Sequence, residues 1–375
     1  MKVGILGGGQ LARMMAAAGR PMGLDFVVLD PAEGVCAGGY AEHVRADWAQ
    51  AQDSAALASC DVITCDFENV PAEVLAALAE RGPVFPPPAA FAAGQDRLDE
   101  KRLLQSLDIP LPDFAAVNSR TDLLEAVERL GFPCVLKTCR LGYDGKGQAV
   151  LRQQEDLELA WQRLGEQPLV LEAWVPFSHE CALTAVRDQH GEIRHYAPSW
   201  TVHDQGILSL AFAPAPLSDD LLADGRAMVA RLLEHFDYVG ALTLEMFVTD
   251  QGLLANEFAP RPHNSAHWTI EGAVCSQFEN HVRAVCGLPL GDTQSRGVSL
   301  MFNWIGELPS ASGFLSLPQL HWHDYAKSAR PGRKVGHATW VADSSKTLFG
   351  QLDAVMPLLP ANQAALLRDL AERVG

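Results

Sequence analysis

Residues 241–258 read ALTLEMFVTDQGLLANEF and carry more structural information than any other part of the chain. Two apolar segments flank residues 250–252, an Asp-Gln-Gly sequence that is typical of a β-hairpin turn. If the hairpin is symmetric about Gln251, Glu245 lies directly opposite Glu257 on the same face. Directly opposed side chains lie about 5 Å apart. Two carboxylates at that distance repel by about 3 kcal/mol at an effective dielectric constant of about 20. The pair therefore needs a magnesium ion, which prefers oxygen ligands, or a shared proton.

The segment 259–268, APRPHNSAHW, follows this hairpin and is rich in polar groups. The spacing of His263 and His267 could suggest a zinc-binding helix, but the glutamate of the H-E-x-x-H motif is missing. A substrate-handling loop is the better interpretation. Arg261 could stabilise the charge of a transferring phosphoryl group, while His263 and Asn264 could orient a nucleophile.

Upstream, Lys137 ends a predicted strand and is followed by GYDGKGQ at 142–148. Three glycines in six positions allow a flap whose N–H groups fold over a polyphosphate, although the motif is no Walker A loop. The alternative is an ordinary tight turn with a solvent-facing lysine. Residues 169–175 then predict an apolar strand whose edge could pair with an adenine ring, with Glu172 accepting from the exocyclic amine. Glu180 could accept from ribose hydroxyls.

The N-terminal sequence GGGQLA at 7–12 matches G-x-G-x-x-A between a predicted strand and a predicted helix. Helix N-termini and glycine loops bind phosphate groups through free N–H groups. Asp30 ends the next strand, where a dehydrogenase would hold a ribose hydroxyl. The loop alone is consistent with a dinucleotide site, a structural turn or a site for another phosphate.

Strand and helix signals alternate over the first ninety residues, which predicts an α/β domain with a parallel sheet. The segment VFPPP at 84–88 interrupts this alternation. We expect a Rossmann-like domain at 1–96, a second domain at 97–290 that carries the flap and the hairpin, and a small C-terminal subdomain at 291–375. Helices are predicted at 11–18, 96–107, 122–130, 156–164 and 221–236.

The formal net charge of −17 disfavours nucleic acids and anionic membranes as partners. An anionic substrate must therefore be held by a local basic cluster. The first residues run straight into the glycine loop, so we expect no signal peptide. Apolar runs fall short of the roughly 18 residues of a membrane helix. Eight cysteines without a C-x-x-C pair favour free thiols in a reducing cytosol.

These motifs, in this order, resemble the ATP-grasp superfamily, and the match is closer still to the N5-carboxyaminoimidazole ribonucleotide synthetases. The resemblance covers nearly the whole chain. It is carried by GQLARM at 9–14, FEN at 67–69, GYDGKGQ at 142–148, NEFAPRPHNS at 256–265 and RPGRKVGH at 330–337.

The resemblance implies an ATP- and bicarbonate-dependent carboxylation of 5-aminoimidazole ribonucleotide through carboxyphosphate, in de novo purine biosynthesis. It also implies magnesium (or manganese), ATP as co-substrate, and a homodimer. The implied metal ligands are Glu245 and Glu257, and the implied catalytic residues are Arg261, His263, Asn264 and Lys146. The implied ATP site comprises Arg97, Lys137, Gly142, Tyr143, Asp144, Gly145, Lys146, Gly147, Gln148, Glu172, Ala173, Trp174, Val175, Glu180, His203, Asn256 and Glu257. The implied ribonucleotide site comprises Gly9, Gln10, Leu11, Glu68, Tyr143, Asp144, His263, Asn264, Arg330, Arg333 and Lys334.

One residue departs from the family pattern. The flap of such enzymes ends Asp-Gly-Arg-Gly-Gln, and here Lys146 replaces the arginine, which keeps the charge but loses the planar fork. The alternatives are another ATP-grasp ligase, such as a formate-dependent glycinamide ribonucleotide transformylase or a biotin carboxylase. An NAD-dependent dehydrogenase and an inactive nucleotide sensor are the alternatives from other classes.

Overall fold

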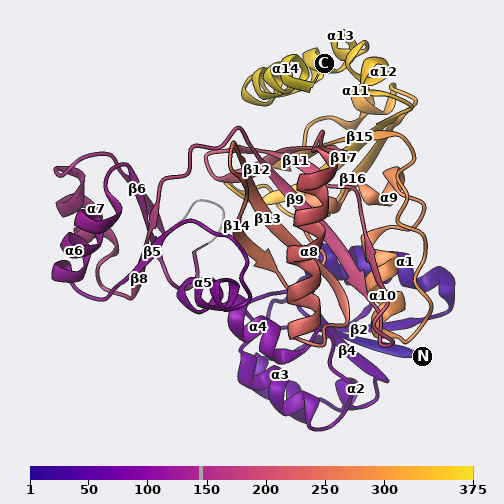
Figure 1. The fold of residues 1–375 in the computed structure, drawn as a ribbon. Coiled ribbons are helices and arrows are strands. Elements are labelled where there is room, and N and C mark those ends of the chain that lie inside the picture. Colours follow the sequence, from indigo (N-terminus) through magenta and orange to yellow (C-terminus); the bar gives the residue numbers. More distant parts are fainter. Residues whose placement is uncertain (143–146, 375) are drawn as a thin grey trace.

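The N-terminal part of the chain forms a parallel sheet, as the alternation of strands and helices predicts. The computed structural model describes residues 1–142 and 147–374. The strand order is β3-β2-β1-β4, and each neighbouring pair is parallel (Figure 1). The strands are β1 Lys2–Leu6, β2 Asp25–Asp30, β3 Glu42–Arg45 and β4 Val62–Cys65. The helices are α1 Gln10–Gly19, α2 Ala55–Ala58, α3 Ala72–Ala79 and α4 Pro88–Gly94, with 3-10 turns η1 Arg20–Met22 and η2 Trp48–Asp53.

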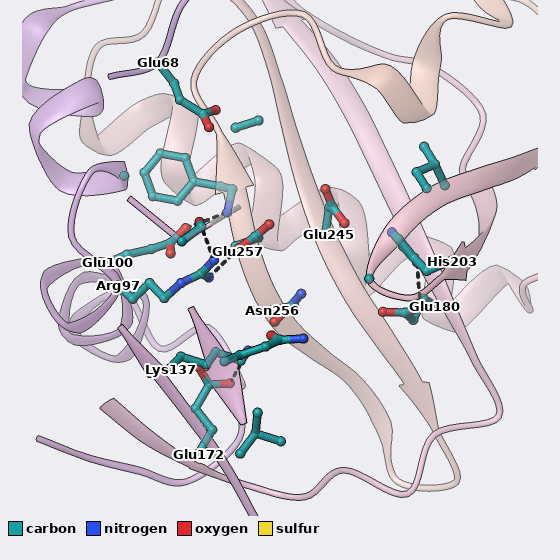
Figure 2. Close-up of a pocket in the computed structure, with 18 of the residues that line it drawn as sticks. Glu68, Arg97, Glu100, Lys137, Glu172, Glu180, His203, Glu245, Asn256 and Glu257 are labelled. Carbon is teal, nitrogen blue, oxygen red and sulfur yellow. Dashed lines mark hydrogen bonds and ion pairs between the residues drawn. The ribbon is translucent and has the colours of Figure 1, made fainter. Parts of the chain in front are cut away.

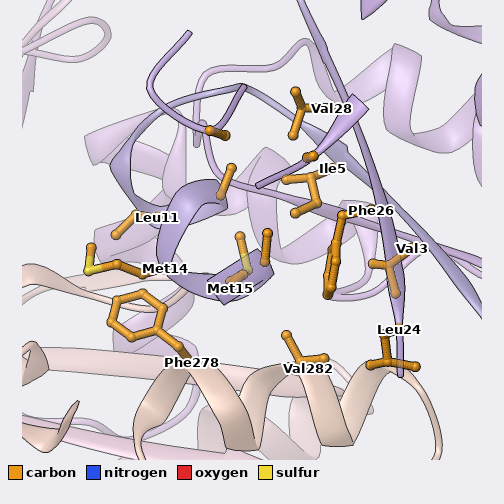
Figure 3. Close-up of a cluster of buried hydrophobic side chains, with 14 of the residues drawn as sticks. Val3, Ile5, Leu11, Met14, Met15, Leu24, Phe26, Val28, Phe278 and Val282 are labelled. Atoms are coloured by element: carbon orange, nitrogen blue, oxygen red, sulfur yellow. The ribbon is translucent and has the colours of Figure 1, made fainter. Parts of the chain in front are cut away.

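Both faces of this sheet are buried at β1, β2 and β4, which explains the continuous apolar runs in these three strands. On one face, Ile5 belongs to a core that includes Phe278 of helix α10 (Gln277–Val285), as Figure 3 shows. On the other face, Leu29 lies in a second core with Leu75 of α3. Because α10 follows the 241–258 hairpin in the chain, the first core attaches the N-terminal sheet to the hairpin region.

A small antiparallel sheet forms a separate lobe with the order β5-β8-β6-β7 (Figure 1). Its strands are β5 Phe114–Val117, β6 Cys134–Thr138, β7 Gln148–Leu151 and β8 Leu169–Ala173, and helices α6 Arg120–Leu130 and α7 Asp156–Leu164 complete its core. The prediction that 169–175 is an edge strand is wrong, because β8 pairs with β5 on one side and β6 on the other. Trp174 and Val175 lie beyond the end of β8.

The third sheet is antiparallel and has nine strands, in the order β14-β13-β9-β11-β12-β15-β17-β16 with β10 paired to β9. Helices α5 Arg97–Ser106 and α8 Asp219–His235 pack on β9, β13 and β14. The strands are β9 His179–Arg187, β10 Ile193–His195, β11 Ser199–Asp204, β12 Ile207–Ala213, β13 Gly240–Thr249, β14 Gly252–Ala259, β15 Val298–Ile305, β16 Leu320–Asp324 and β17 Lys334–Ala342.

The C-terminal part of the chain shares this sheet, because β15 pairs with β12. Its helices cover a core built jointly with β11 and β12. On α14, Gln363 Nε2 donates to the carbonyl oxygens of Ser209 (3.2 Å) and Asn303 (3.1 Å). The remaining elements are η3 Asn264–Ala266, α9 Thr269–Gly272, α11 Ala311–Leu315, α12 Ser345–Phe349, α13 Leu352–Val355, η4 Met356–Leu358 and α14 Ala361–Val374.

The hairpin of β13 and β14 pairs Glu245 with Glu257, as predicted, but its turn differs from the predicted one. Thr249 pairs with Gly252, so the loop consists of residues 250–251 and the hairpin is not symmetric about Gln251. With regular pairing from this turn onward, the two glutamates would not face each other.

A β-bulge in β14 restores the pairing of the two glutamates. Met246 pairs with Ala255, whereas the next pair along the strands is Glu245 with Glu257. Asn256 is therefore the extra residue, and it shifts the register by one position. The bulge brings both glutamates to the same face, with the asparagine next to Glu257 on β14.

Two expectations from composition concern membrane helices and cysteines. Within the ranges 1–142 and 147–374, no helix combines the length and the apolar character that crossing a bilayer requires. All eight cysteines are free, and six of them are buried. Burial raises the pKa of half-buried Cys36 to about 11, so this thiol stays protonated at neutral pH.

The close approach of the glycine loop to β4 predicts that Gly9→Ala destabilises the protein. An added β-carbon would collide with the carboxylate of Asp66, to which the Gly9 N–H donates. We expect a loss of about 1–3 kcal/mol, measured as a lower melting temperature. Gly39→Ala is the control, because no heavy atom lies within 4 Å of its added β-carbon, and it should change stability by less than about 0.5 kcal/mol. Equal melting temperatures for the two variants would contradict the clash.

Candidate active site

A cavity of about 550 Å³ lies between the small antiparallel sheet and the β13–β14 hairpin (Figure 2). Strands β6, β7 and β8 line one side, while β13, β14 and the loop after β14 line the other. The residues of the sequence-based prediction that line it are Glu68, Arg97, Lys137, Gly142, Gln148, Glu172, Ala173, Trp174, Val175, Glu180, His203, Glu245, Asn256, Glu257, Arg261, His263, Asn264 and Lys334. Segments far apart in the sequence therefore meet in one polar cavity.

The two opposed glutamates have different charge environments. Glu257 Oε2 accepts from Arg97 Nη1 at 2.6 Å. Burial alone would raise the pKa of Glu257, but Arg97 outweighs it and lowers this pKa to about 2. Burial and the neighbouring Glu257 raise the pKa of Glu245 to about 7. Glu257 is thus a firmly charged anion, whereas Glu245 takes up a proton near neutral pH unless a cation is present.

The donor set at this pair fits magnesium. Asn256 has a buried Oδ1 with no hydrogen-bond partner among the described residues. It lines the same cavity as the two carboxylates, and carboxylate and amide oxygens are hard ligands that suit this ion. In the described residues, no group of three His, Cys, Asp or Glu side chains could hold a metal. A magnesium ion here would therefore complete its coordination with phosphate oxygens or water.

Two lysines and a glutamate form a buried cluster on the other wall of the cavity. Lys137 Nζ lies 3.0 Å from Glu172 Oε2, and Lys101 Nζ lies 3.2 Å from Glu172 Oε1. Burial lowers the pKa of Lys137. Burial would raise the pKa of Glu172, but the two lysines reverse this effect and lower it. Two cations and one anion leave a net positive charge beside the cavity, which suits a phosphate group.

Glu180 and His203 interact on neighbouring strands β9 and β11. His203 Nδ1 lies 2.8 Å from Glu180 Oε2, the contact drawn in Figure 2. Burial would lower the pKa of His203, but the hydrogen bond and charge of Glu180 outweigh it and raise this pKa. The pair places a carboxylate and an imidazole at the same wall of the cavity.

The loop after β14 presents three different polar groups to the cavity. Arg261 is ion-paired with Glu68 of the N-terminal domain. His263 Nε2 lies 3.1 Å from Glu245 Oε1, and burial lowers the pKa of His263 well below its usual value, so its ring is neutral at pH 7. Both side-chain polar atoms of Asn264 are buried without a partner among the described residues. A guanidinium, a neutral imidazole and an unpaired amide therefore face the cavity near the two glutamates.

The N–H groups of the N-terminal glycine loop are occupied by carboxylates. Gly8 N donates to Asp30 Oδ2 at 2.8 Å. Gly9 N and Leu11 N both donate to the buried carboxylate of Asp66. A dinucleotide pyrophosphate would need these same groups. This arrangement removes the observation on which the dehydrogenase alternative was based.

The C-terminal basic segment, residues 327–334, contacts the glycine loop at the edge of the site. Lys327 Nζ donates to the side chain of Gln10, although the two residues are 317 positions apart in the sequence. Lys334 lines the cavity, whereas Arg330 and Arg333 do not. The two segments predicted to bind a ribonucleotide phosphate are thus adjacent.

Three protein-family models match consecutive parts of the chain: the ribonucleotide synthetase preATP-grasp domain at 1–95, the ATP-grasp domain at 102–278, and the phosphoribosylaminoimidazole carboxylase C-terminal domain at 299–349. N5-carboxyaminoimidazole ribonucleotide synthase from Pseudomonas aeruginosa is 48% identical over 362 residues, which cover 96% of this chain and 100% of that protein. The chain belongs to this synthase family. The resemblance seen in the sequence and the predicted fold class are confirmed.

Solved structures of N5-carboxyaminoimidazole ribonucleotide synthases share the fold. The enzyme from Thermus thermophilus is 46% identical, with a TM-score of 0.91, and the match covers 95% of this chain and 98% of that one. The synthase from Aspergillus clavatus, in complex with ADP and 5-aminoimidazole ribonucleotide, is 31% identical with a TM-score of 0.87, and the match covers 99% of this chain and 98% of that one.

Some residues predicted for the synthase site lie elsewhere. Tyr143, Asp144, Gly145 and Lys146 lie outside the described residues. The residues that do not line the cavity are Gly9, Gln10, Leu11, Gly147, Arg330 and Arg333. Of these six residues, Gln10 accepts a hydrogen bond from Lys327, which belongs to the same basic segment as Lys334.

The sequence-based prediction missed two charged residues of α5, Glu100 and Lys101. Lys101 pairs with Glu172 in the buried cluster. Glu100 accepts from Phe258 N at 2.6 Å, and burial and the charge of Glu257 raise the pKa of Glu100 to about 8. A signal was available, because Lys101 stands three residues before Leu104 and so falls on the apolar face of the predicted helix.

The raised pKa of Glu245 predicts a pH-dependent penalty in the metal-free protein. The usual pKa is about 4.5 and the folded value is about 7, so the folded state holds a proton that the unfolded state releases. Stability therefore falls as the pH rises from about 4.5 to about 7. At pH 8 in EDTA, Glu245→Gln should raise the free energy of unfolding above that of wild type by on the order of 2–3 kcal/mol, seen as a higher melting temperature. At about pH 5 the gain should be much smaller. A difference that does not change with pH would contradict the assignment.

Proposed function

We propose that this chain uses ATP and bicarbonate to carboxylate the amine of 5-aminoimidazole ribonucleotide, giving N5-carboxyaminoimidazole ribonucleotide through carboxyphosphate in de novo purine biosynthesis. The chain is an ATP-grasp ligase by its family membership. The observation that carries the proposal is the Glu245–Glu257 pair, which shares one cavity with the lysine cluster and the Arg261 loop. The ADP and ribonucleotide bound to the Aspergillus clavatus relative support the two larger substrates.

The ATP phosphates would lie between the lysine cluster and the paired glutamates. Lys137 lines the cavity and neutralises phosphate charge, while buried Lys101 lies behind it and pairs with Glu172. Arg97 bridges Glu257 and the carbonyl oxygen of Gly142 (3.0 Å) at the start of the flap. We assign to the glycine-rich sequence 142–148, of which residues 143–146 lie outside the described residues, the exclusion of water from the phosphates. Carboxyphosphate requires this exclusion because it hydrolyses readily.

The adenosine part of ATP would occupy the wall formed by residues 172–175, Glu180 and His203. The carboxylate of Glu172 already pairs with two lysines. Hydrogen bonding to adenine is therefore assigned to the backbone beyond β8, at Trp174 and Val175, instead of the Glu172 side chain. Glu180 accepts from the ribose hydroxyls.

Glu245 and Glu257 would hold magnesium, or manganese, with Asn256 beside them. Such an ion would supply positive charge to the phosphate groups of ATP. Its arrival also removes the need for Glu245 to take up a proton. If Glu245 and Glu257 only shared a proton, as in the alternative interpretation, the pair would bring no positive charge to the phosphate groups.

Arg261, His263 and Asn264 handle bicarbonate and the amine. A bicarbonate oxygen attacks the γ-phosphorus, the bond to the bridging oxygen breaks, and ADP leaves. The amine nitrogen of the ribonucleotide then attacks the carboxyl carbon, phosphate leaves, and the nitrogen loses a proton. Arg261 stabilises the developing negative charge, while the neutral ring of His263 and the unpaired amide of Asn264 orient the nucleophile. The family resemblance also assigns Tyr143, Asp144 and Lys146 to this step, and these residues lie outside the described part of the chain.

The 5′-phosphate of the ribonucleotide would be held by the basic segment and the N-terminal domain. Lys334, Arg330 and Arg333 supply the charge. The segment 9–11 borders them through the side chain of Gln10, which accepts from Lys327. The N–H groups of Gly9 and Leu11 stay with Asp66, and Glu68 stays with Arg261. We further propose that the chain acts as a homodimer in the cytoplasm and is divided into the units 1–96, 97–290 and 291–375. The match to family models with similar limits supports this division.

Measuring ADP release from Mg·ATP, with and without 5-aminoimidazole ribonucleotide and bicarbonate, tests the function. Strong stimulation by the ribonucleotide, lost when bicarbonate is removed, is the expected outcome. Glu257→Gln should reduce turnover by at least about a thousandfold without changing the fold, because it removes a metal ligand. Stimulation by formate or biotin instead would favour another ATP-grasp ligase. Binding of ATP without steady turnover would favour an inactive sensor.

Lys334→Ala tests the phosphate site. We expect the KM for the ribonucleotide to rise about tenfold or more, with little change in the KM for ATP. Lys346→Ala, on the C-terminal helix α12, is the charge-matched control and should leave both constants unchanged. An unchanged KM in Lys334→Ala would move the phosphate site elsewhere.

A further inference from the structure

Gln277, the first residue of α10, is fully buried and holds the backbone of the Arg261 loop. Its Oε1 accepts from His263 N at 2.9 Å, and its Nε2 donates to His263 O at 2.7 Å. The same Nε2 lies 3.1 Å from Nδ1 of buried His267. One carboxamide therefore binds both backbone polar groups of the residue whose ring contacts Glu245.

Other contacts hold neighbouring residues of the loop: Ser199 Oγ donates to Ser265 O at 2.9 Å, and Thr269 Oγ1 donates to Ala266 O at 2.6 Å. Asn264 makes no side-chain hydrogen bond among the described residues. The ring of His263 depends on contacts with Ser265 Oγ (2.9 Å) and Glu245 Oε1 (3.1 Å). The backbone of His263 itself, which sets the starting point of its ring and of the following Asn264, is held by the side chain of Gln277.

The Gln277 contact is attached to a rigid part of the molecule. The next residues of α10, including Phe278 and Val282, pack into the core of the N-terminal sheet (Figure 3). A side chain that starts on a packed helix defines a position better than one on a free loop. Gln277 therefore ties the geometry of the loop to the N-terminal domain that carries Glu68, the partner of Arg261.

We propose that Gln277 is a positioning residue for carboxyl transfer: it holds His263 and Asn264 in place against the ribonucleotide amine and bicarbonate. This inference rests on the proposed roles of those two residues. Gln277 does not line the cavity, so it acts only through the loop.

The same helix supplies a matched control one turn away. Asn280 is also fully buried, and its carboxamide binds both backbone groups of one residue: Gly291 N donates to Oδ1 at 2.7 Å, and Nδ2 donates to Gly291 O at 3.2 Å. Gly291 lies outside the cavity lining. Removing either carboxamide should cost similar stability, but only Gln277 should affect the reaction.

The test compares Gln277→Met with Asn280→Leu, two substitutions that keep side-chain volume and remove the hydrogen bonds. Gln277→Met should lower kcat/KM for the ribonucleotide by about a hundredfold and change the KM for ATP by less than about twofold. Asn280→Leu should lower the melting temperature by a comparable amount and leave both constants near wild type. Equal kinetic effects in the two variants would overturn the proposal.

A second variant and a second readout separate this inference from the proposed function. Gln277→Glu keeps the size and the acceptor for His263 N–H but loses the donor, so it should show the same kinetic pattern. Amide hydrogen exchange over residues 260–266 should become faster in both Gln277 variants and stay unchanged in Asn280→Leu. Unchanged exchange would overturn the positioning role, whatever the substrate. A wild type without ribonucleotide-stimulated ADP release would instead contradict the proposed function.

Discussion

The pairing of β13 with β14 forces two carboxylates to face each other, and the rest of the site responds to that repulsion. Arg97 compensates one charge, while the other stays incomplete until a proton or a cation arrives. The unpaired amide oxygen of Asn256 stands beside them. With the proposed magnesium, a site that is electrostatically unsatisfied in the free protein would gain its missing charge together with the substrate, and this would link folding of the hairpin to nucleotide binding.

The glutamate pair could be predicted from the sequence, but its structural cause could not. The apolar flanks and the Asp-Gln-Gly turn identify a hairpin, and the equal spacing from Gln251 suggests the pairing. The structure reaches the same pairing through a shorter turn and a bulge at Asn256. A single inserted residue has no sequence signature of its own, because its effect depends on which turn forms.

Long-range contacts explain the other differences between prediction and structure. The glycine loop carries a phosphate-binding pattern, yet Asp66, which occupies its N–H groups, stands more than fifty residues away. Strand β8 lies inside its sheet, between β5 and β6. The sequence around Glu172 does not indicate whether this strand is central or at an edge. Family resemblance recovered most of the cavity residues, whereas the buried charges of α5 required the packing of the fold to become visible.

The sharing of one sheet by the central and C-terminal parts limits how this enzyme can be divided. Strand β12 is apolar and pairs with β15, which comes from the C-terminal part. A chain that ends before Val298 would leave the backbone groups of β12 unpaired along an exposed edge, the kind of surface on which strands of other molecules add. Fragments that follow the family-model limits would therefore be prone to aggregation, because the central and C-terminal parts complete one sheet.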